Sequence, residues 1–197
     1  VSIPMPESQW QVFVDDVELT EADALGTVDE GFKILFDTLN PERIILSSLC
    51  VGVGRFALRK AVAYANERKV FNKVPIGAYQ GLQHPLAVAY SEIEMAGLMT
   101  HKAAWAFNIG IPGFPSTIFD NRLPAGEFAN MAKYAAAEAG IHAVDASLQC
   151  FGGNGFTKEY GIFDLYPVVR LLRTAPLNRE MVLNYIGEKV MGLPRSY

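Results

Sequence analysis

Two long segments of the chain are each apolar on one side, at the spacing of an α-helix. In the first segment the apolar positions recur at alternating steps of four and three: Leu82, Leu86, Ala89, Ile93, Ala96, Thr100, Ala103 and Phe107. The second segment carries a similar face: Phe128, Ala132, Ala135, Ala139, Ala143 and Ala146. This periodicity predicts helices that bury one stripe against their neighbours in a bundle. The many alanines predict a close approach between these helices.

Two further helical regions flank this pair. Asn40 is a candidate N-cap and Pro41 fits the first helical position, so we predict a helix from there to about Lys69. A last helical region is predicted over 165–191, with an interruption near Pro176. The predicted connections are rich in glycine or proline and cover 71–80, 108–124 and 151–156. The third helix, which carries the second apolar face, is predicted to start near Pro124. The sequence therefore predicts an all-α fold, an antiparallel four-helix bundle.

The amino-terminal segment has a different character. Residues 11–19, QVFVDDVEL, are rich in β-forming side chains and predict one short strand. A lone strand is unstable in water because its edges need partners, so we expect it to be the remnant of a larger β-domain and the chain to begin inside something larger. The predicted division is a β-domain remnant and connector over 1–38 and a helical bundle over 39–197.

Composition argues against several classes of protein. Seventeen Lys and Arg against 21 Asp and Glu leave a formal charge of -4, which does not favour a nucleic-acid partner. Cys50 and Cys150 stand in apolar surroundings without metal-ligand spacing, which predicts buried, reduced thiols and a cytoplasmic location. The three histidines share no such spacing either, so no metal is predicted. Neither a signal peptide nor an apolar run of membrane-spanning length is present, which predicts a soluble protein.

A succession of motifs runs through the chain in a fixed order. The motifs are FVDDVEL, GFKIL, PERIILSSLCVG, YANERKVFNKVPIGAYQGLQHPLA, NMAKYAAAEA and DASLQCFGGNGFTKEY. This succession resembles the second half of acyl-CoA dehydrogenases, flavin enzymes that oxidise acyl-CoA thioesters. In that family an amino-terminal helical domain and a middle β-domain precede a carboxyl-terminal four-helix bundle. The resemblance implies that residues 11–19 are the last piece of the middle domain.

The resemblance also implies a binding site for FAD. The segment ERKVFNK is similar to a family motif, ERxxFGK, in which the Arg meets the cofactor diphosphate and the Phe packs on its adenosine portion. Those roles fall to Arg68 and Phe71, and Asn72 replaces the usual Gly. Arginine suits a diphosphate because its planar guanidinium donates forked, charge-assisted hydrogen bonds. The remaining cofactor candidates by resemblance are Gln80, Gln149, Gly152 and Gly153.

The catalytic base of the family is a carboxylate that removes a proton beside the thioester carbonyl. Most members carry it in a YEGT-like motif, but the matching residues here, 175–178, are APLN and contain no carboxylate. The isovaleryl-CoA and long-chain enzymes place the base on the first bundle helix, and Glu42 and Arg43 match that position. Glu42 is therefore the candidate base and Arg43 a candidate substrate contact. An ordinary first-turn Glu would instead be solvated and favoured by the helix dipole. Glu180, the rival carboxylate, belongs by its register to the outward face of the last helix.

Pro176 is a second departure from the family pattern. Family members polarise the substrate carbonyl partly through the backbone N–H at this position, and proline has none. Two explanations remain open: the register slips by one residue, or the contact is rebuilt from other groups.

These observations lead to one functional hypothesis and one alternative. The first is an FAD-dependent acyl-CoA dehydrogenase acting on an acyl-CoA substrate, with an electron-transfer protein as a candidate acceptor. By resemblance it forms a homodimer or homotetramer, or a hetero-oligomer with a homologous chain. The alternative is a non-catalytic bundle subunit that completes the FAD site of a partner. We expect the chain alone to retain FAD weakly and to show little activity.

Overall fold

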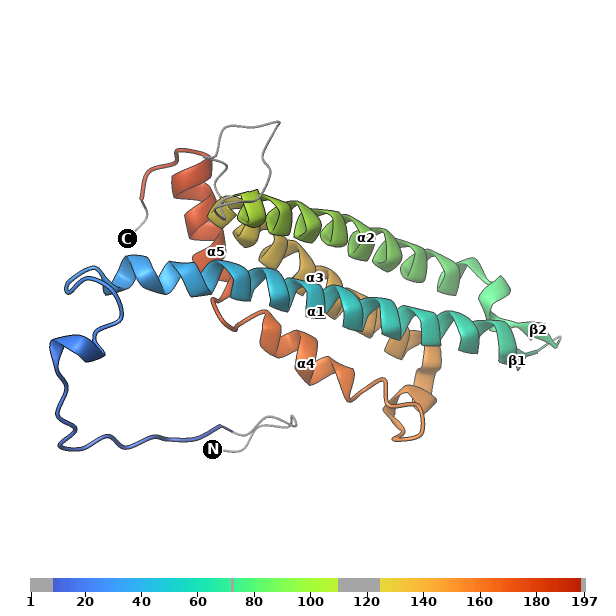
Figure 1. The fold of residues 1–197 in the computed structure, drawn as a ribbon. Helices are drawn as coiled ribbons and strands as arrows, with labels where there is room; N and C mark the ends of the chain where they lie inside the picture. The colour runs from blue at the N-terminus through green and yellow to red at the C-terminus, as the bar shows by residue number, and fades with distance from the viewer. Residues whose placement is uncertain (1–8, 72, 110–124, 196–197) are drawn as a thin grey trace.

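The computed structural model describes residues 9–71, 73–109 and 125–195 (Figure 1). Three long α-helices dominate the described chain: α1 Gly31–Glu67, α2 Gln80–Ile109 and α3 Ala125–Phe151. Two short helices follow, α4 Leu165–Leu172 and α5 Arg179–Tyr185, and a π-helical turn η4 Ile186–Val190 continues α5. The remaining elements are the 3-10 turns η1 Glu21–Asp23, η2 Ile76–Ala78 and η3 Gly152–Phe156 and the strands β1 Lys69–Val70 and β2 Val74–Pro75.

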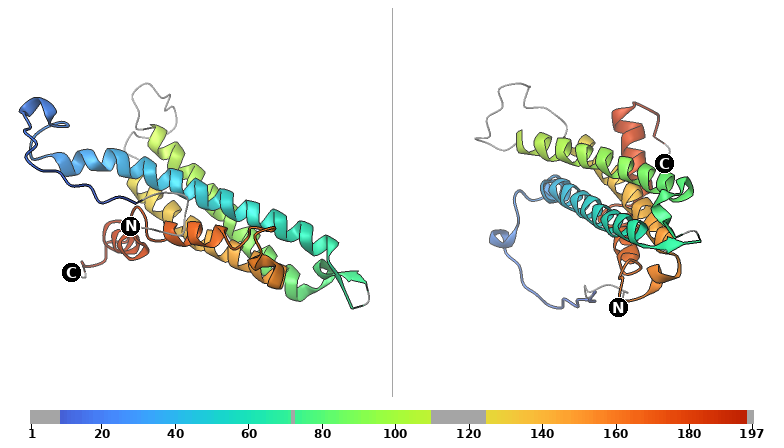
Figure 2. Two further views of the ribbon diagram at one scale, coloured as in Figure 1. Left: turned by 90° about the horizontal axis from the view of Figure 1, so that it is seen from below. Right: turned by 90° about the vertical axis from the view of Figure 1, so that its right-hand side faces the viewer.

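The helices α1 to α4 run up and down along a common long axis, whereas α5 lies across it (Figures 1 and 2). The helix α3 lies at the centre and packs against α1, α2 and α4, while α5 covers the end of the bundle where α1 begins. The break between α4 and α5 falls at residues 173–178, as Pro176 predicts. The all-α bundle is thereby confirmed, with the fourth position shared by two short helices. No helix among the described residues is both long and apolar enough to cross a bilayer.

Small side chains form the core, as the periodicity of the sequence predicts. Along α2 the buried positions include Leu86, Ala89, Ile93, Ala96, Thr100 and Ala103. Along α3 they include Ala132, Ala136, Ala139, Ala143 and Ala146. Alanine and glycine at these positions let the helix backbones approach closely, which the larger aliphatic side chains would prevent.

The start of α1 corrects the sequence-based prediction. The helix begins at Gly31, and Pro41 lies in its interior and not at its first position. Ile34 secures the first turn by packing over Gly26, where an added Cβ would lie 2.2 Å from Ile34 Cδ1. An interior proline removes one backbone hydrogen bond and costs about 3 kcal/mol or more, which the packing of a 37-residue helix outweighs.

The predicted amino-terminal strand is also wrong. Residues 11–19 contain no strand, and residues 9–30 are exposed and lead away from the bundle before returning to α1 (Figure 2). The segment does not pair with the described strands, and a lone strand without partners is not stable in water. Among the residues that the structure describes, strands occur only in the predicted loop 71–80 and just before it, where β1 and β2 pair Lys69 with Pro75 and Val70 with Val74.

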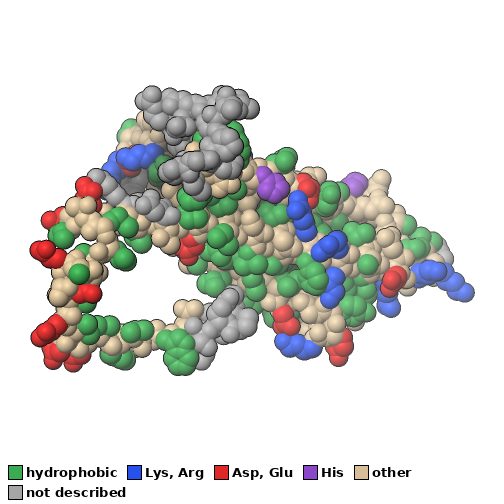
Figure 3. All heavy atoms as spheres, viewed as in Figure 1, with side chains coloured by type: hydrophobic (Ala, Val, Ile, Leu, Met, Phe, Trp, Pro, Cys, Tyr) green, Lys and Arg blue, Asp and Glu red, His purple; other side chains and the backbone are tan. Residues whose placement is uncertain are grey.

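Several large apolar side chains remain exposed on α1 and α2. Ile45 is 66% exposed, Leu98 71% and Met95 62%, and apolar groups cover much of the bundle face seen in Figure 3. An apolar area of this kind on a water-facing bundle is typical of a surface that packs against other protein.

The two thiols are buried and free, as predicted. Burial raises the pKa of Cys50 to about 12, although the nearby charge of Lys133 opposes the effect. Burial also raises the pKa of Cys150. Because the thiolate is the reactive form, both residues should be inert while the chain is folded.

We expect stability to fall at alkaline pH because of Cys50. The unfolded chain loses this proton near pH 9 and the folded chain only near 12, so the unfolded state binds fewer protons in between. The contribution is complete below pH 9 and declines above it by up to about 1.4 kcal/mol per pH unit. Urea midpoints measured from about pH 8 to about pH 10.5 should show this decline, and Cys50→Ala should flatten it. Equal slopes in the two proteins would contradict the assignment.

Candidate active site

The predicted site residues lie at the two ends of the bundle. Glu42 and Arg43 lie in the first third of α1, where Ile44 packs in one cluster with Phe128 of α3 and Arg43 is close to Tyr185 of α5. All the FAD candidates lie at the opposite end, where α1 finishes, α2 begins and α3 passes into η3 (Figure 1). A rise of 1.5 Å per residue puts Glu42 and Arg68 about 39 Å apart along α1. The structure therefore brings the cofactor candidates together but separates them from the candidate base.

Glu42 is half-buried, and Arg43 beside it is only 2% exposed. The Nη1 of Arg43 donates a hydrogen bond to Asn40 Oδ1 at 3.1 Å. Burial lowers the pKa of Arg43, while the nearby Tyr185 and Glu42 act in the opposite direction. Because α1 begins at Gly31, Glu42 lies three turns into the helix, where the dipole of the first turn no longer acts. The physical basis for reading Glu42 as a first-turn solvated residue is thereby removed.

A buried lysine lies close to this end of α1. Lys133 on α3 is 2% exposed, and its Nζ donates a hydrogen bond to the carbonyl oxygen of Leu172, the last residue of α4. Burial lowers its pKa, as does the charge of Arg43, while Cys50 and Glu138 oppose the shift. Our sequence reasoning missed Lys133, although its spacing of four from Ala129 and seven from Gly140 places it on the buried face of α3.

The turn that corresponds to the family's usual base connects α4 to α5. The Ala175–Pro176 peptide bond in it is cis. Asn178 ends the turn as the N-cap of α5, its Oδ1 accepting a hydrogen bond from Met181 N at 2.8 Å. Glu180 follows in the first turn of α5 with its side chain 71% exposed, on the outer surface as its register predicts.

The FAD candidates at the other end are open to solvent. Arg68 is the exposed C-cap of α1, and the Phe71 ring is 92% exposed in the turn between β1 and β2. Gln80 at the start of α2 and Gln149 near the end of α3 are exposed as well. Their side chains are therefore available to a ligand that approaches this end of the bundle.

The glycines of the turn at η3 differ in their structural roles. Gly152 has a φ of +57°, a left-handed conformation that favours glycine. An added Cβ at Gly155 would lie 3.1 Å from the carbonyl oxygen of Leu148, so close packing requires this glycine. An added Cβ at Gly153 would meet nothing within 4 Å, so open space lies beside the backbone there.

Aromatic side chains hold this turn against α1. The Tyr64 ring stacks on Phe151 with 4.3 Å between centroids and meets Tyr160 edge-on at 5.6 Å. Its hydroxyl accepts a hydrogen bond from Asn154 Nδ2 at 3.0 Å. The sequence motif identified the glycines, but these contacts across the bundle emerge only from the structure.

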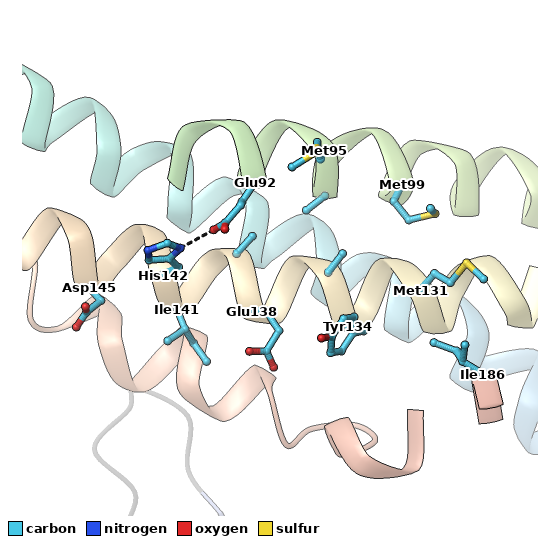
Figure 4. Close-up of a pocket in the computed structure, with 13 residues that line it drawn as sticks. Glu92, Met95, Met99, Met131, Tyr134, Glu138, Ile141, His142, Asp145 and Ile186 are labelled. Atoms are coloured by element: carbon cyan, nitrogen blue, oxygen red, sulfur yellow. Dashed lines mark hydrogen bonds and ion pairs between the residues drawn. The ribbon is translucent and has the colours of Figure 1, made fainter. Parts of the chain in front are cut away.

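A groove of about 780 Å³ runs between α2 and α3, separate from both sets of candidates (Figure 4). Met95, Met99 and Met131 line it, and His142 Nδ1 lies 2.5 Å from Glu92 Oε2 across it. No group of three His, Cys, Asp or Glu residues in the described chain is arranged to hold a metal.

Comparison with known families identifies the class of protein. Residues 29–191 match the model of the acyl-CoA dehydrogenase C-terminal domain, and the chain belongs to this family. It is 50% identical over 192 residues to the acyl-CoA dehydrogenase FadE12 of Mycobacterium tuberculosis, covering 98% of this chain and 47% of that protein. It is 34% identical over 166 residues to a glutaryl-CoA dehydrogenase of Desulfococcus multivorans, covering 84% and 38%. The chain thus spans less than half the length of these relatives.

Solved structures show the same arrangement of helices. A glutaryl-coenzyme A dehydrogenase in complex with glutaryl-CoA superposes with a TM-score of 0.79 at 27% identity, covering 93% of this chain and 44% of that one. The butyryl-CoA dehydrogenase from Megasphaera elsdenii gives 0.78 at 27% identity, covering 89% and 43%. The resemblance seen in the motifs is confirmed.

Proposed function

We propose that the chain is the carboxyl-terminal part of an FAD-dependent acyl-CoA dehydrogenase that introduces an α,β double bond into an acyl-CoA thioester. Glu42 carries this proposal, because it is a half-buried carboxylate on the first bundle helix of a family member whose 175–178 turn has none. The named activities of FadE12 and of the glutaryl-CoA dehydrogenase support the reaction class.

The residues at the far end of the bundle fit FAD. Arg68 offers an exposed cation to a diphosphate, and the exposed Phe71 ring offers a face to an adenosine. Beside them, the open space at Gly153 admits a ligand close to the backbone. Bound FAD would supply the hydride acceptor of the reaction.

Glu42 performs the proton transfer in this proposal. Its carboxylate accepts the proton from the carbon next to the thioester carbonyl, and the electron pair of that C–H bond enters the new double bond. Arg43 lies beneath it with its guanidinium buried, so its charge acts on Glu42 and the bound substrate from inside the bundle. A contact of Arg43 with the substrate stays a prediction.

The separation along α1 implies that two chains share each site. Glu42 has to reach the carbon beside the flavin ring, whereas Arg68 has to reach the diphosphate of a cofactor. The ribityl chain that joins these parts of one FAD is far shorter than about 39 Å. We therefore propose an oligomer in which Glu42 of one copy and Arg68 of another serve the same FAD. The exposed apolar side chains of α1 and α2 provide surface for such an assembly.

The flavin spectrum tests the proposal directly. We expect the complete enzyme, of which this chain is the proposed carboxyl-terminal part, to lose its flavin absorbance on addition of an acyl-CoA under anaerobic conditions when it is loaded with FAD. A protein that binds FAD and keeps its absorbance with acyl-CoA thioesters of short, medium and long chain would exclude the dehydrogenase. Pro176, which cannot donate a backbone hydrogen bond to the carbonyl, is the observation that favours this alternative, a non-catalytic subunit.

We expect Arg68→Ala to weaken FAD binding by roughly 10- to 100-fold, because a charged hydrogen-bond donor to the diphosphate is lost. Arg59→Ala is the matched control, since Arg59 is also exposed on α1 but lies more than two turns earlier. Fluorescence titration with FAD measures both dissociation constants. Equal weakening by the two substitutions would assign the effect to overall charge and contradict a specific contact.

A further inference from the structure

One carboxylate on α3 reaches both ends of the turn between α4 and α5. Glu138 Oε1 lies 2.8 Å from Arg173 Nε and 3.0 Å from Arg179 Nε. Figure 4 shows Glu138 and Tyr134 projecting from α3 toward this connection. All three side chains of the ion-pair cluster are about one-third exposed, so solvent screens these pairs less than it screens pairs on the open surface.

Arg173 and Arg179 are also joined through the backbone. Arg179 N donates a hydrogen bond to Arg173 O at 3.2 Å, which closes the turn into a loop. The Tyr134 ring lies 5.7 Å from the Arg179 guanidinium. A hydrogen bond with Tyr134 and the charge of Glu138 both raise the pKa of Arg179. Lys133, five residues before Glu138, holds Leu172 just ahead of the turn.

Charge balance makes Glu138 the central member of this cluster. Arg173, Arg179 and the buried Lys133 are three cations, and the charge of Lys133 interacts with Glu138. The other nearby carboxylate, Glu180, is 3.6 Å from Arg179 Nη1 and mostly exposed. Removing the charge of Glu138 would leave the two arginines to repel each other across the mouth of the turn.

We propose that Glu138 is a positioning residue that fixes the turn 174–178 for the reaction. This inference rests on the proposed function and on the family resemblance of residues 175–178, which implies that this turn lies near the thioester carbonyl. Pro176 has no N–H, so a contact between this turn and the substrate carbonyl has to come from other groups of the turn. Such a contact requires that the turn is held in an exact position. The two-ended ion pair of Glu138 supplies that placement without touching the substrate.

The first test follows the turn itself and needs no activity. We expect Glu138→Gln to raise hydrogen exchange in residues 174–178 by about tenfold or more, with α3 still protected. Glu138→Asp, which keeps the charge, should restore part of the protection. Glu94→Gln is the matched control, because Glu94 makes a similar ion pair with Arg55 at 2.8 Å between α2 and α1. Unchanged exchange in 174–178 for Glu138→Gln would overturn the proposal.

The second test separates positioning from simple support of the fold. In the FAD-loaded complete enzyme, we expect Glu138→Gln to lower the rate of flavin reduction by about 10- to 100-fold, while the dissociation constant for acyl-CoA changes less than about threefold. Glu138→Asp should recover part of the rate. Faster exchange in the turn with an unchanged rate of flavin reduction would show that the clamp, the ion pairs of Glu138 with Arg173 and Arg179, has only a structural role. This result would overturn the positioning role. If the unsubstituted protein itself fails to reduce flavin, the proposed function fails and the positioning role falls with it, while the exchange result still decides the clamp.

Discussion

In the complete enzyme, Glu42→Gln is expected to lower the rate at which acyl-CoA reduces the bound flavin by about 10²- to 10⁴-fold. The amide has nearly the same shape as the carboxylate but cannot accept the substrate proton. Binding of FAD and acyl-CoA should change little, so the effect should appear in kcat or in the single-turnover rate and leave the dissociation constants near their original values. Rapid-mixing absorbance measurements of the flavin separate these quantities.

Glu180→Gln is the control for this prediction. Glu180 is the other carboxylate near the turn 175–178, and its side chain is 71% exposed on α5. We expect its replacement to change the rate less than about threefold, as for an exposed residue away from the reacting atoms. A large loss with Glu180→Gln and a normal rate with Glu42→Gln would move the base to α5 and refute the assignment of Glu42.

The position of Glu42 shows where sequence and structure differ in what they reveal. The residue type and its match to the family could be found in the sequence, but its helical environment could not. An Asn-Pro pair has the same local chemistry at a helix start and about three turns inside a longer helix, so Pro41 misplaced the start of α1 by about ten residues. The packing of Ile34 over Gly26 near the observed start of α1 is a contact between segments, which no local sequence pattern reveals.

The ion pairs of Glu138 at the α4–α5 turn also could not be predicted from the sequence. Periodicity predicted the buried alanines of α3 because each helix carries that information in its own spacing. The partners of Glu138, in contrast, lie 35 and 41 residues further along the chain, and no local pattern marks them. Pro176 predicted the break in the helix, but only the folded chain shows which side chains hold the resulting turn.

Gly54 is expected to be the most sensitive glycine of the bundle. It lies where α1 meets α2 and α3, and an added Cβ would be 2.3 Å from Ile93 Cδ1 and 3.3 Å from Ala143 Cβ. Ile93 and Ala143 are both fully buried, so neither has free space to move into. Gly54→Val should therefore destabilise the chain by about 3 kcal/mol, at the upper end for overpacking of a core. For a chain of this length the melting temperature should fall by roughly 6 to 12 °C.

Gly52, two residues earlier on α1, provides the matched control. It is exposed, and an added Cβ would meet nothing within 4 Å. Gly52→Val should leave stability unchanged or raise it by a few tenths of a kcal/mol, because valine is a slightly better helix former than glycine. Urea titrations followed by far-ultraviolet circular dichroism compare the two variants. If both variants unfolded at the urea concentration of the original protein, the helices could not be as close at Gly54 as described. The close contacts of glycine and alanine would then not set the distance between α1 and α2. Nor would they set the spacing of the bundle that carries Glu42 and Arg68.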